Sequence, residues 1–161
     1  MIDNQEEAKM NIVLFEPEIH SNTGNIARTC AITGASLHLI KPLGFSLEDK
    51  YLKRAGLDYW EYLDLKIYEN YEEFLEKNNS GNLYFFSTKG EVTYTQKIYE
   101  ENDYLVFGPE TRGLPLDIME PHWENVCKIP MGEKFRSLNL SNAVAIVLYE
   151  ALRQGDFKGL K

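Results

Sequence analysis

A chain of 161 residues with 43% hydrophobic residues is long enough to form one domain with its own core. Its net charge of −8 argues against broad, non-specific binding to nucleic acid, because affinity for phosphate groups comes largely from Lys and Arg. There are only two cysteines, Cys30 and Cys127, which indicates buried free thiols in a reducing compartment. With three scattered histidines, the sequence offers no spacing typical of a metal site. The lack of a long apolar run indicates a cytoplasmic protein without a membrane span.

The apolar pattern predicts strands and helices that alternate along the chain. Strands are expected at 11–15, 36–40, 65–68, 83–87, 104–107 and 126–129, and helices at 22–33, 47–55, 71–77 and 141–154. Gly34, Gly56 and Gly155 follow three of these helices, where helix-ending glycines commonly stand. Continuous apolar strands such as IVLF and YLVF are typical of a parallel sheet covered on both faces. We therefore expect one α/β domain over residues 10–161, with a mostly parallel sheet and helices on both faces, preceded by a mobile polar tail at 1–9.

Three segments that follow expected strands carry more polar side chains than an ordinary loop needs. NTGNIARTCAITG follows the strand at 11–15, PETRGLP follows 104–107, and MGEKFRSLNLSNA follows 126–129. In any one of these segments, the polar residues are also explained by an ordinary loop whose side chains cap the next helix or face solvent. Because loops after parallel strands are where open α/β sheets bind ligands, three such loops together predict a ligand site.

Common nucleotide and hydrolase motifs are absent from the sequence. Gly108 and Gly113 have the glycine spacing of a P-loop, but Leu114 and Pro115 stand where Lys and Ser or Thr are required. No GxGxxG opens a helix, and GxSxG does not occur. These observations exclude NTP hydrolysis by a P-loop and give no support to a Rossmann dinucleotide site.

The sequence resembles the SPOUT superfamily of RNA methyltransferases, and within it the family that methylates the ribose 2'-hydroxyl of the wobble nucleotide of certain tRNAs. The similar strings are FEPEIHSNTGNIARTCAITGASLHLIKPLGF, KYLKRAGLDY, STKG, DYLVFGPETRGLP and IPMGEKFRSLNLSNAVAIVLYEALRQ, which run from about residue 10 to residue 158. The chain departs from the family pattern at 20–21, where a proline-containing pair is common, at Phe135, where a small polar residue is usual, and at Trp60, which follows GLDY.

The resemblance implies an enzyme that uses S-adenosyl-L-methionine (AdoMet) to 2'-O-methylate a wobble cytidine or modified uridine, with leucine tRNAs among its substrates. It also implies a deep trefoil knot in the C-terminal third and a homodimer formed through the first and last helices. One alternative is ribose methylation of ribosomal RNA, although related enzymes with that target often carry an extra RNA-binding domain. Another alternative is a catalytically silent module that binds RNA or AdoMet.

The resemblance also assigns a set of cofactor contacts, at Phe86, Gly108, Ile129, Ser137 and Leu138. These residue types suit the cofactor, because a pocket for AdoMet needs apolar walls and a few polar groups. Gly108 would let the backbone approach the ligand closely. Read without the family, the three apolar residues in this set would be core residues.

The catalytic positions implied by the resemblance are Arg28 and Asn22. An arginine is a poor general base, and its planar fork suits a bidentate contact with an RNA phosphate, so we expect Arg28 to orient the target nucleotide. Removal of the proton stays open between phosphate-assisted Arg28 and solvent. Glu110 contacts the substrate or pairs with an arginine, either Arg112 or Arg136. The expected substrate-binding residues are Lys53, Arg54, Glu110, Arg136 and Asn142, with Lys50, Lys89 and Lys134 as further candidates for contacts with the tRNA backbone.

The charge distribution is compatible with an RNA partner despite the acidic total. Residues 21–60 and 129–161 each hold five basic and three acidic side chains. Residues 1–20 and 61–104 hold five basic and fifteen acidic side chains together. RNA binding is therefore expected at a local patch.

Overall fold

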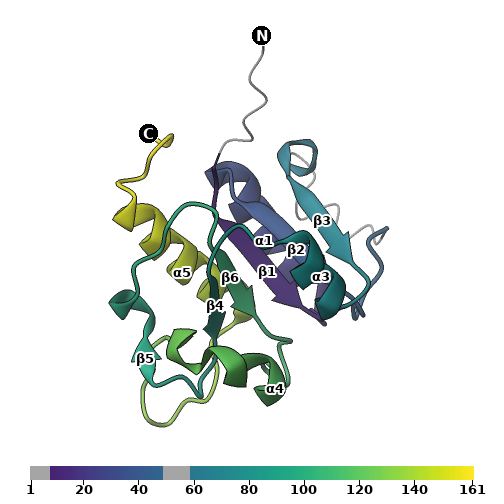
Figure 1. Cartoon of the computed structure of the whole chain (residues 1–161). Coiled ribbons are helices and arrows are strands. Elements are labelled where there is room, and N and C mark those ends of the chain that lie inside the picture. Colours follow the sequence, from purple (N-terminus) through teal and green to yellow (C-terminus); the bar gives the residue numbers. More distant parts are fainter. Residues whose placement is uncertain (1–7, 49–58) are drawn as a thin grey trace.

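The computed structural model describes residues 8–48 and 59–161, which contain a parallel sheet with the strand order β3-β2-β1-β6-β4-β7-β5 (Figure 1). The strands are β1 (Asn11–Phe15), β2 (Ser36–Ile40), β3 (Leu65–Tyr68), β4 (Leu83–Phe86), β5 (Val92–Thr93), β6 (Tyr104–Phe107) and β7 (Val126–Lys128). The predicted parallel sheet is confirmed, and each predicted strand is present within one residue of its expected end. β5 was not predicted, because two residues are too few to show a period.

The described helices are α1 (His20–Thr33), α3 (Tyr71–Lys77), α4 (Leu116–Met119) and α5 (Leu140–Gln154), with 3₁₀ turns at Trp60–Tyr62, Tyr94–Gln96 and Glu120–Asn125. The predicted helices at 22–33, 71–77 and 141–154 are confirmed. The helix predicted at 47–55 and the tail predicted at 1–9 lie largely outside the described residues. Among the helices described, none has the length and apolar character needed to cross a membrane.

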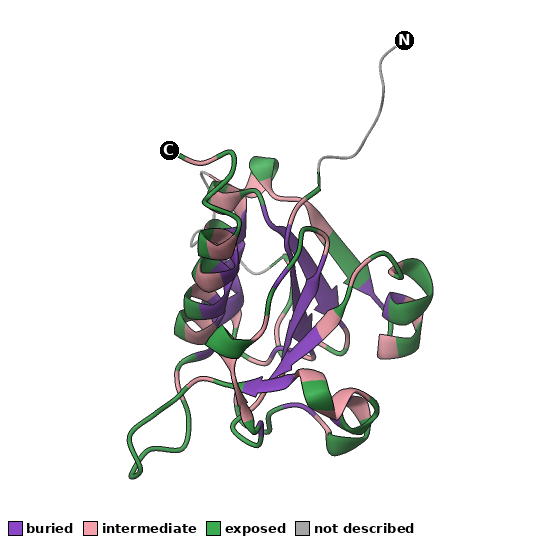
Figure 2. Ribbon diagram, turned by 60° about the vertical axis from the view of Figure 1, so that its left-hand side comes forward, coloured by how far each residue is buried: buried purple, intermediate pink, exposed green. Residues whose placement is uncertain are grey.

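Helices cover both faces of the sheet, so that the strands lie buried between them (Figure 2). Alternate residues of β1 face opposite sides: Ile12 and Leu14 join the core formed with α1 and α5, whereas Val13 and Phe15 join the core formed with α3 and α4. This alternation follows from the period of two residues in a strand. The continuous apolar runs in the sequence have this origin, since both sets of side chains are buried.

Two predicted helix-ending glycines behave differently. Gly34 ends α1 in the left-handed conformation, with φ of 78°, which glycine adopts without a steric penalty. Gly155 follows α5 with φ of −87°, and the left-handed residues are instead Asp156 and Phe157. The position of Gly155 was therefore predicted correctly, but its backbone does not use the freedom that glycine provides.

The chain enters the middle of the sheet late in the sequence. β6 lies between β1 and β4, and β7 pairs with the far side of β4. The chain then returns through residues 129–139 to α5, whose Val144 and Val147 share a core with Ile26 of α1. The knot implied by the family resemblance stays a prediction.

Both cysteines are buried free thiols, as predicted. Cys30 lies in α1 and Cys127 in β7, on the same side of the sheet. Burial raises the pKa of Cys30, and it raises the pKa of Cys127 to about 11. Neither sulfur is therefore a reactive thiolate at neutral pH.

His38 lies in a buried polar network on the side of the sheet that α3 covers. Its Nε2 is 2.9 Å from Asn11 Oδ1, and its Nδ1 is 2.8 Å from the Tyr68 hydroxyl. Asn11 Nδ2 donates to the carbonyl groups of Asn102 and Asp103, so its Oδ1 must accept from His38. Nε2 therefore donates and Nδ1 accepts, which describes a neutral imidazole. Burial lowers the pKa of His38 to about 4.

We expect this network to make folding stability depend on pH. The unfolded histidine has the ordinary pKa of 6.5, so the contribution of neutral His38 is complete above that pH and is lost as the pH falls toward 4. The difference between the pKa values of His38 in the unfolded and folded states corresponds to about 3 kcal/mol of unfolding free energy. Urea unfolding at constant ionic strength should show a flatter dependence on pH between 6.5 and 4 for His38→Gln than for the wild type. Parallel curves for the two proteins would contradict this assignment.

Candidate functional site

The carboxyl ends of β1, β6, β4 and β7 meet at one edge of the sheet, as parallel pairing requires. The segments that follow these strands enclose a cavity of about 500 Å³. Its lining comes from the start of α1, from residues 86–89 and 107–114, and from the segment between β7 and the first turn of α5. The three loops that predicted a ligand site therefore meet in one place, and the cavity has the size of a small-molecule site.

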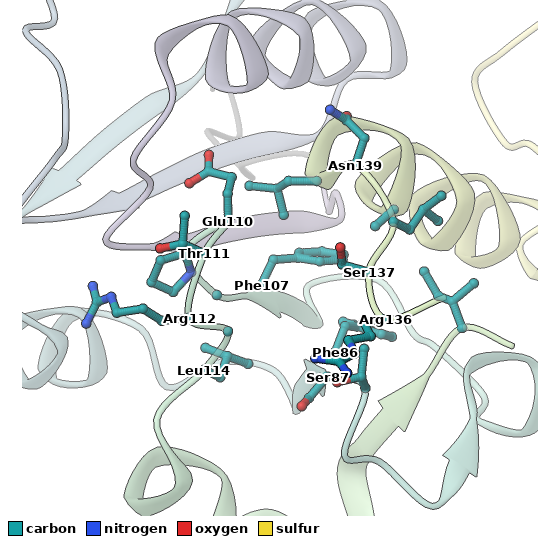
Figure 3. Close-up of a pocket in the computed structure, with 18 of the residues that line it drawn as sticks. Phe86, Ser87, Phe107, Glu110, Thr111, Arg112, Leu114, Arg136, Ser137 and Asn139 are labelled. Atoms are coloured by element: carbon teal, nitrogen blue, oxygen red, sulfur yellow. The ribbon is translucent and has the colours of Figure 1, made fainter. Parts of the chain in front are cut away.

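All the predicted cofactor contacts line this cavity, namely Phe86, Gly108, Ile129, Ser137 and Leu138. The rings of Phe86 and Phe107 stack with a centroid separation of 4.9 Å and an interplanar angle of 18°. Figure 3 shows Phe107 in the middle of the lining residues, with Thr111 and Ser137 on opposite sides in that view. The stacked pair gives the cavity a rigid apolar wall between polar loops.

Gly108 is required by the protein's own backbone. A Cβ at this position would clash with the backbone nitrogen of Leu114 and would lie 2.5 Å from the carbonyl carbon of Gly113. The turn is closed by the Gly113 N–H, which donates to the Pro109 carbonyl at 2.9 Å. The close approach predicted for a ligand is thus made first by residues 113–114, which fold back over the end of β6.

Glu110 caps the start of α1 from a neighbouring loop. The helix begins at His20, two residues before the predicted start, and its N-cap residue, Ile19, makes no side-chain cap. Glu110 accepts hydrogen bonds from the backbone N–H groups of Glu18 at 2.7 Å and Ile19 at 3.2 Å, and from Asn22 Nδ2 at 3.5 Å. A carboxylate at this position satisfies free N–H groups and faces the positive end of the helix dipole.

A second carboxylate completes the contact between the two loops. Glu18 accepts hydrogen bonds from the backbone N–H of Thr111 at 3.0 Å and from its hydroxyl at 2.7 Å. The Thr111 backbone N–H, and then its hydroxyl, hold the pKa of Glu18 below its usual value. Arg112, considered above as a partner of Glu110, instead pairs with Glu16 at 3.3 Å. The loops after β1 and β6 are therefore joined in both directions, because each supplies a carboxylate that accepts hydrogen bonds from the other.

Asn22 extends this contact to the third loop. Its side chain is 6% exposed, and its Oδ1 accepts a hydrogen bond from Asn139 Nδ2 at 3.1 Å. Asn139 is the N-cap of α5, and its Oδ1 accepts from the backbone N–H groups of Ser141 and Asn142. Because Asn22 also donates to Glu110, one buried amide links all three loops and the starts of both long helices.

Other predicted site residues lie away from the cavity. Arg28 is exposed on α1, with its guanidinium carbon 4.8 Å from the centroid of the Tyr59 ring and Nη2 3.4 Å from the Tyr59 hydroxyl. Asn142 is exposed on α5 and does not line the cavity. Lys53 and Arg54 lie outside the described residues. The catalytic arginine predicted from the resemblance is therefore on the helix that the cavity loops position, and not in the cavity wall.

The loop after β4 also belongs to the site. Ser87, Thr88 and Lys89 line the cavity, and the Lys89 N–H donates to Ser87 Oγ at 3.1 Å. From the sequence, Lys89 is predicted only as a contact with the tRNA backbone. Its signal was the same one that identified the other loops, a polar segment directly after a predicted strand. Lys89 and Arg136, which also lines the cavity, bring two cations to its wall.

The chain is similar to known methyltransferases in sequence and in structure. The model of the SpoU rRNA Methylase family matches residues 9–149. A tRNA (cytidine(34)-2'-O)-methyltransferase of Saccharophagus degradans is 53% identical over 152 residues, which cover 94% of this chain and 99% of that protein. A solved structure that concerns the 2-OH methylation of C/U34 on tRNA is 45% identical, with a TM-score of 0.89, and the match covers 92% of this chain and 97% of the other.

A more distant structure shares the fold alone. An AdoMet-bound rRNA methyltransferase from Sinorhizobium meliloti is 23% identical, with a TM-score of 0.81, over 90% of this chain and 56% of that chain. The match of the family model to nearly the whole chain and the high identity to full-length relatives carry the assignment. The chain belongs to the SpoU methylase family, within the SPOUT methyltransferases.

Proposed function

We propose that this chain is a cytoplasmic enzyme that transfers a methyl group from AdoMet to the ribose 2'-hydroxyl of the wobble cytidine or modified uridine of tRNA, with leucine tRNAs among its substrates. The main support is that the five predicted cofactor contacts line one cavity, beside the helix that carries Arg28. The full-length relative of 53% identity is named for this reaction.

The residues of the cavity fit AdoMet. Phe86, Phe107, Ile129 and Leu138 offer apolar surface for a purine ring and an alkyl chain, and Ser137 offers a hydroxyl for a polar group. A volume of about 500 Å³ lies within the range of small-molecule sites. When bound, AdoMet would supply an activated methyl group for transfer to an oxygen nucleophile.

The protein's own contribution is mainly orientation of the reacting groups. Arg28 would hold an RNA phosphate through its planar fork, in place of its contact with Tyr59. Asn22 and Glu110 would act as positioning residues, because their polar atoms bind the starts of α1 and α5. Holding the 2'-hydroxyl against the methyl donor replaces an unfavourable bimolecular encounter.

The direct test is incubation with labelled AdoMet and total tRNA, followed by nucleoside mapping. We expect label in a 2'-O-methylated pyrimidine at the wobble position. Label that appears only in ribosomal RNA, offered in a parallel reaction, would favour the alternative target. Binding of AdoMet without transfer to any RNA would instead favour a silent module.

Arg28→Lys should lower turnover with tRNA on the order of 100-fold and leave AdoMet affinity near the wild-type value. Lysine keeps the positive charge but loses the planar fork that aligns the phosphate. Single-turnover methylation and calorimetric titration of AdoMet measure the two effects separately. Near-normal methylation would show that the fork is unimportant, and an equal loss of AdoMet affinity would place Arg28 in the cofactor site.

Binding of tRNA should weaken steeply with salt despite the sequence pI of about 4.9. If about five phosphates are neutralised, the slope of log affinity against log salt should lie near roughly −4 to −5. Charge reversal at Lys53 and Arg54 should make this slope shallower without changing AdoMet affinity. Equal slopes for the wild type and the double variant would contradict the assignment of these residues to the RNA patch.

We also propose a homodimer that forms through the first and last helices, α1 and α5. The outer side of α5 exposes Ile146 and Tyr149, although its other side already fills the core. Light scattering should give about twice the 18.6 kDa of one chain. Ile146→Asp should shift the mass toward the monomer, whereas Ile98→Asp, at another exposed isoleucine, should leave it unchanged. A wild-type mass of one chain at micromolar concentration would contradict the proposal.

A further inference from the structure

The segment between β7 and α5 presents an aromatic side chain to solvent. Residues 130–137 are all exposed, and the loop projects from the body of the protein in Figure 2. Phe135 is 74% exposed, although a phenylalanine gains free energy from burial. Its position therefore contributes little to the stability of the fold.

The loop backbone holds Phe135 in this position. Its N–H donates to the Gly132 carbonyl at 3.0 Å, which closes a turn over residues 132–135. A Cβ on Gly132 would lie 3.3 Å from Cδ2 and 3.6 Å from Cε2 of Phe135, so the glycine leaves room for one edge of the ring. The ring is supported on that edge, and most of the side chain stays accessible.

The surroundings of Phe135 distinguish it from an isolated surface hydrophobe, which would need no explanation. Lys134 and Arg136 flank it in sequence, and residues 128–139 hold three cations and one carboxylate in a chain with a net charge of −8. Arg136 and Met131 of the same loop line the cavity described above. Phe135 itself does not line the cavity, but it directly precedes Arg136, which does, and its two sequence neighbours are side chains that attract phosphate groups.

We propose that Phe135 is a stacking platform for an unpaired RNA base next to the nucleotide that is methylated. The proposal rests on the proposed function and names how the substrate is held. Proteins recognise single-stranded RNA by placing splayed bases on aromatic rings while cations follow the backbone. A phenyl ring has no hydrogen-bonding group, so it accepts any base and selects for a base that is unpaired. It is a positioning residue, and it favours a loop over a duplex as the substrate.

Phe135→Leu tests the contact, because it keeps an apolar side chain and removes the ring face. We expect the affinity for an anticodon stem–loop RNA to fall roughly 5- to 150-fold, the range for loss of one stacked base. The AdoMet affinity and the slope of RNA affinity against salt should not change, because no cofactor contact and no phosphate contact is lost. Lys134→Ala should weaken RNA binding with a shallower slope.

Phe157→Leu is the matched control. Phe157 is 40% exposed and follows the far end of α5, about 20 Å from the cavity by the length of that helix. This variant should bind RNA like the wild type. A stem–loop with 2-aminopurine beside the target nucleotide reports stacking directly: its fluorescence should change on binding to the wild type and to Phe157→Leu, and should change much less with Phe135→Leu.

The outcomes separate this proposal from the proposed function. If the wild type methylates the wobble nucleotide and Phe135→Leu binds the stem–loop equally well, stacking is overturned and the function stands. If the wild type transfers no methyl group to tRNA but the RNA affinities still differ as expected, the function fails and the platform stands. A loss of AdoMet affinity with unchanged RNA affinity would assign Phe135 to covering the cofactor, and an equal loss of RNA affinity in both phenylalanine variants would assign the effect to general destabilisation.

Discussion

The pairing of β6 with β1 on one side and β4 on the other fixes the geometry of the sheet edge that forms the cavity. Every residue of β6 is buried, and its pairing is parallel on both sides. The register sets Phe107 opposite Leu14 of β1 and Phe86 of β4. The ring stack in the cavity wall follows from that register, because side chains at paired positions of adjacent strands lie on the same face. The loops after these strands therefore begin at one level and share a single cavity.

Two carboxylates connect the loops at this edge of the sheet through hydrogen bonds. Glu110 binds backbone N–H groups at the start of α1, and Glu18 returns hydrogen bonds to Thr111. Hydrogen bonds to charged groups are shorter and stronger than those between neutral groups. The direction of α1, and with it the position of Arg28, is therefore tied to the loop that lines the cavity. Asn22 and Asn139 bring the start of α5 into the same network.

Electrostatics in this protein are local. The chain is acidic as a whole, yet the carboxylates of Glu110 and Glu18 accept hydrogen bonds from backbone N–H groups, and Glu16 pairs with Arg112. Lys89 and Arg136 line the cavity, and Lys134 lies two residues before Arg136 in the sequence. Because charges at exposed sites are screened beyond about 10 Å, an approaching polyanion responds to these neighbours more than to the distant acidic segments. Net charge is a poor guide to the partner here.

The strands other than β5, the long helices and the three loops of the site are predictable from the sequence. Those features have local causes: the apolar runs of β1 and β6, the glycine after α1, and the capping asparagine before α5. β5, with two residues, and α4, with four, were not predicted because such short elements show no measurable hydrophobic period. The cap that Glu110 provides to α1, and the bridge that Asn22 forms to two other loops, are visible only in the folded protein. Partners so distant along the chain leave no periodic pattern in the sequence. The strand order is likewise visible only in the fold, because apolar strands of similar composition do not indicate which strands they pair with. Many strand orders would bury both faces of the sheet equally well.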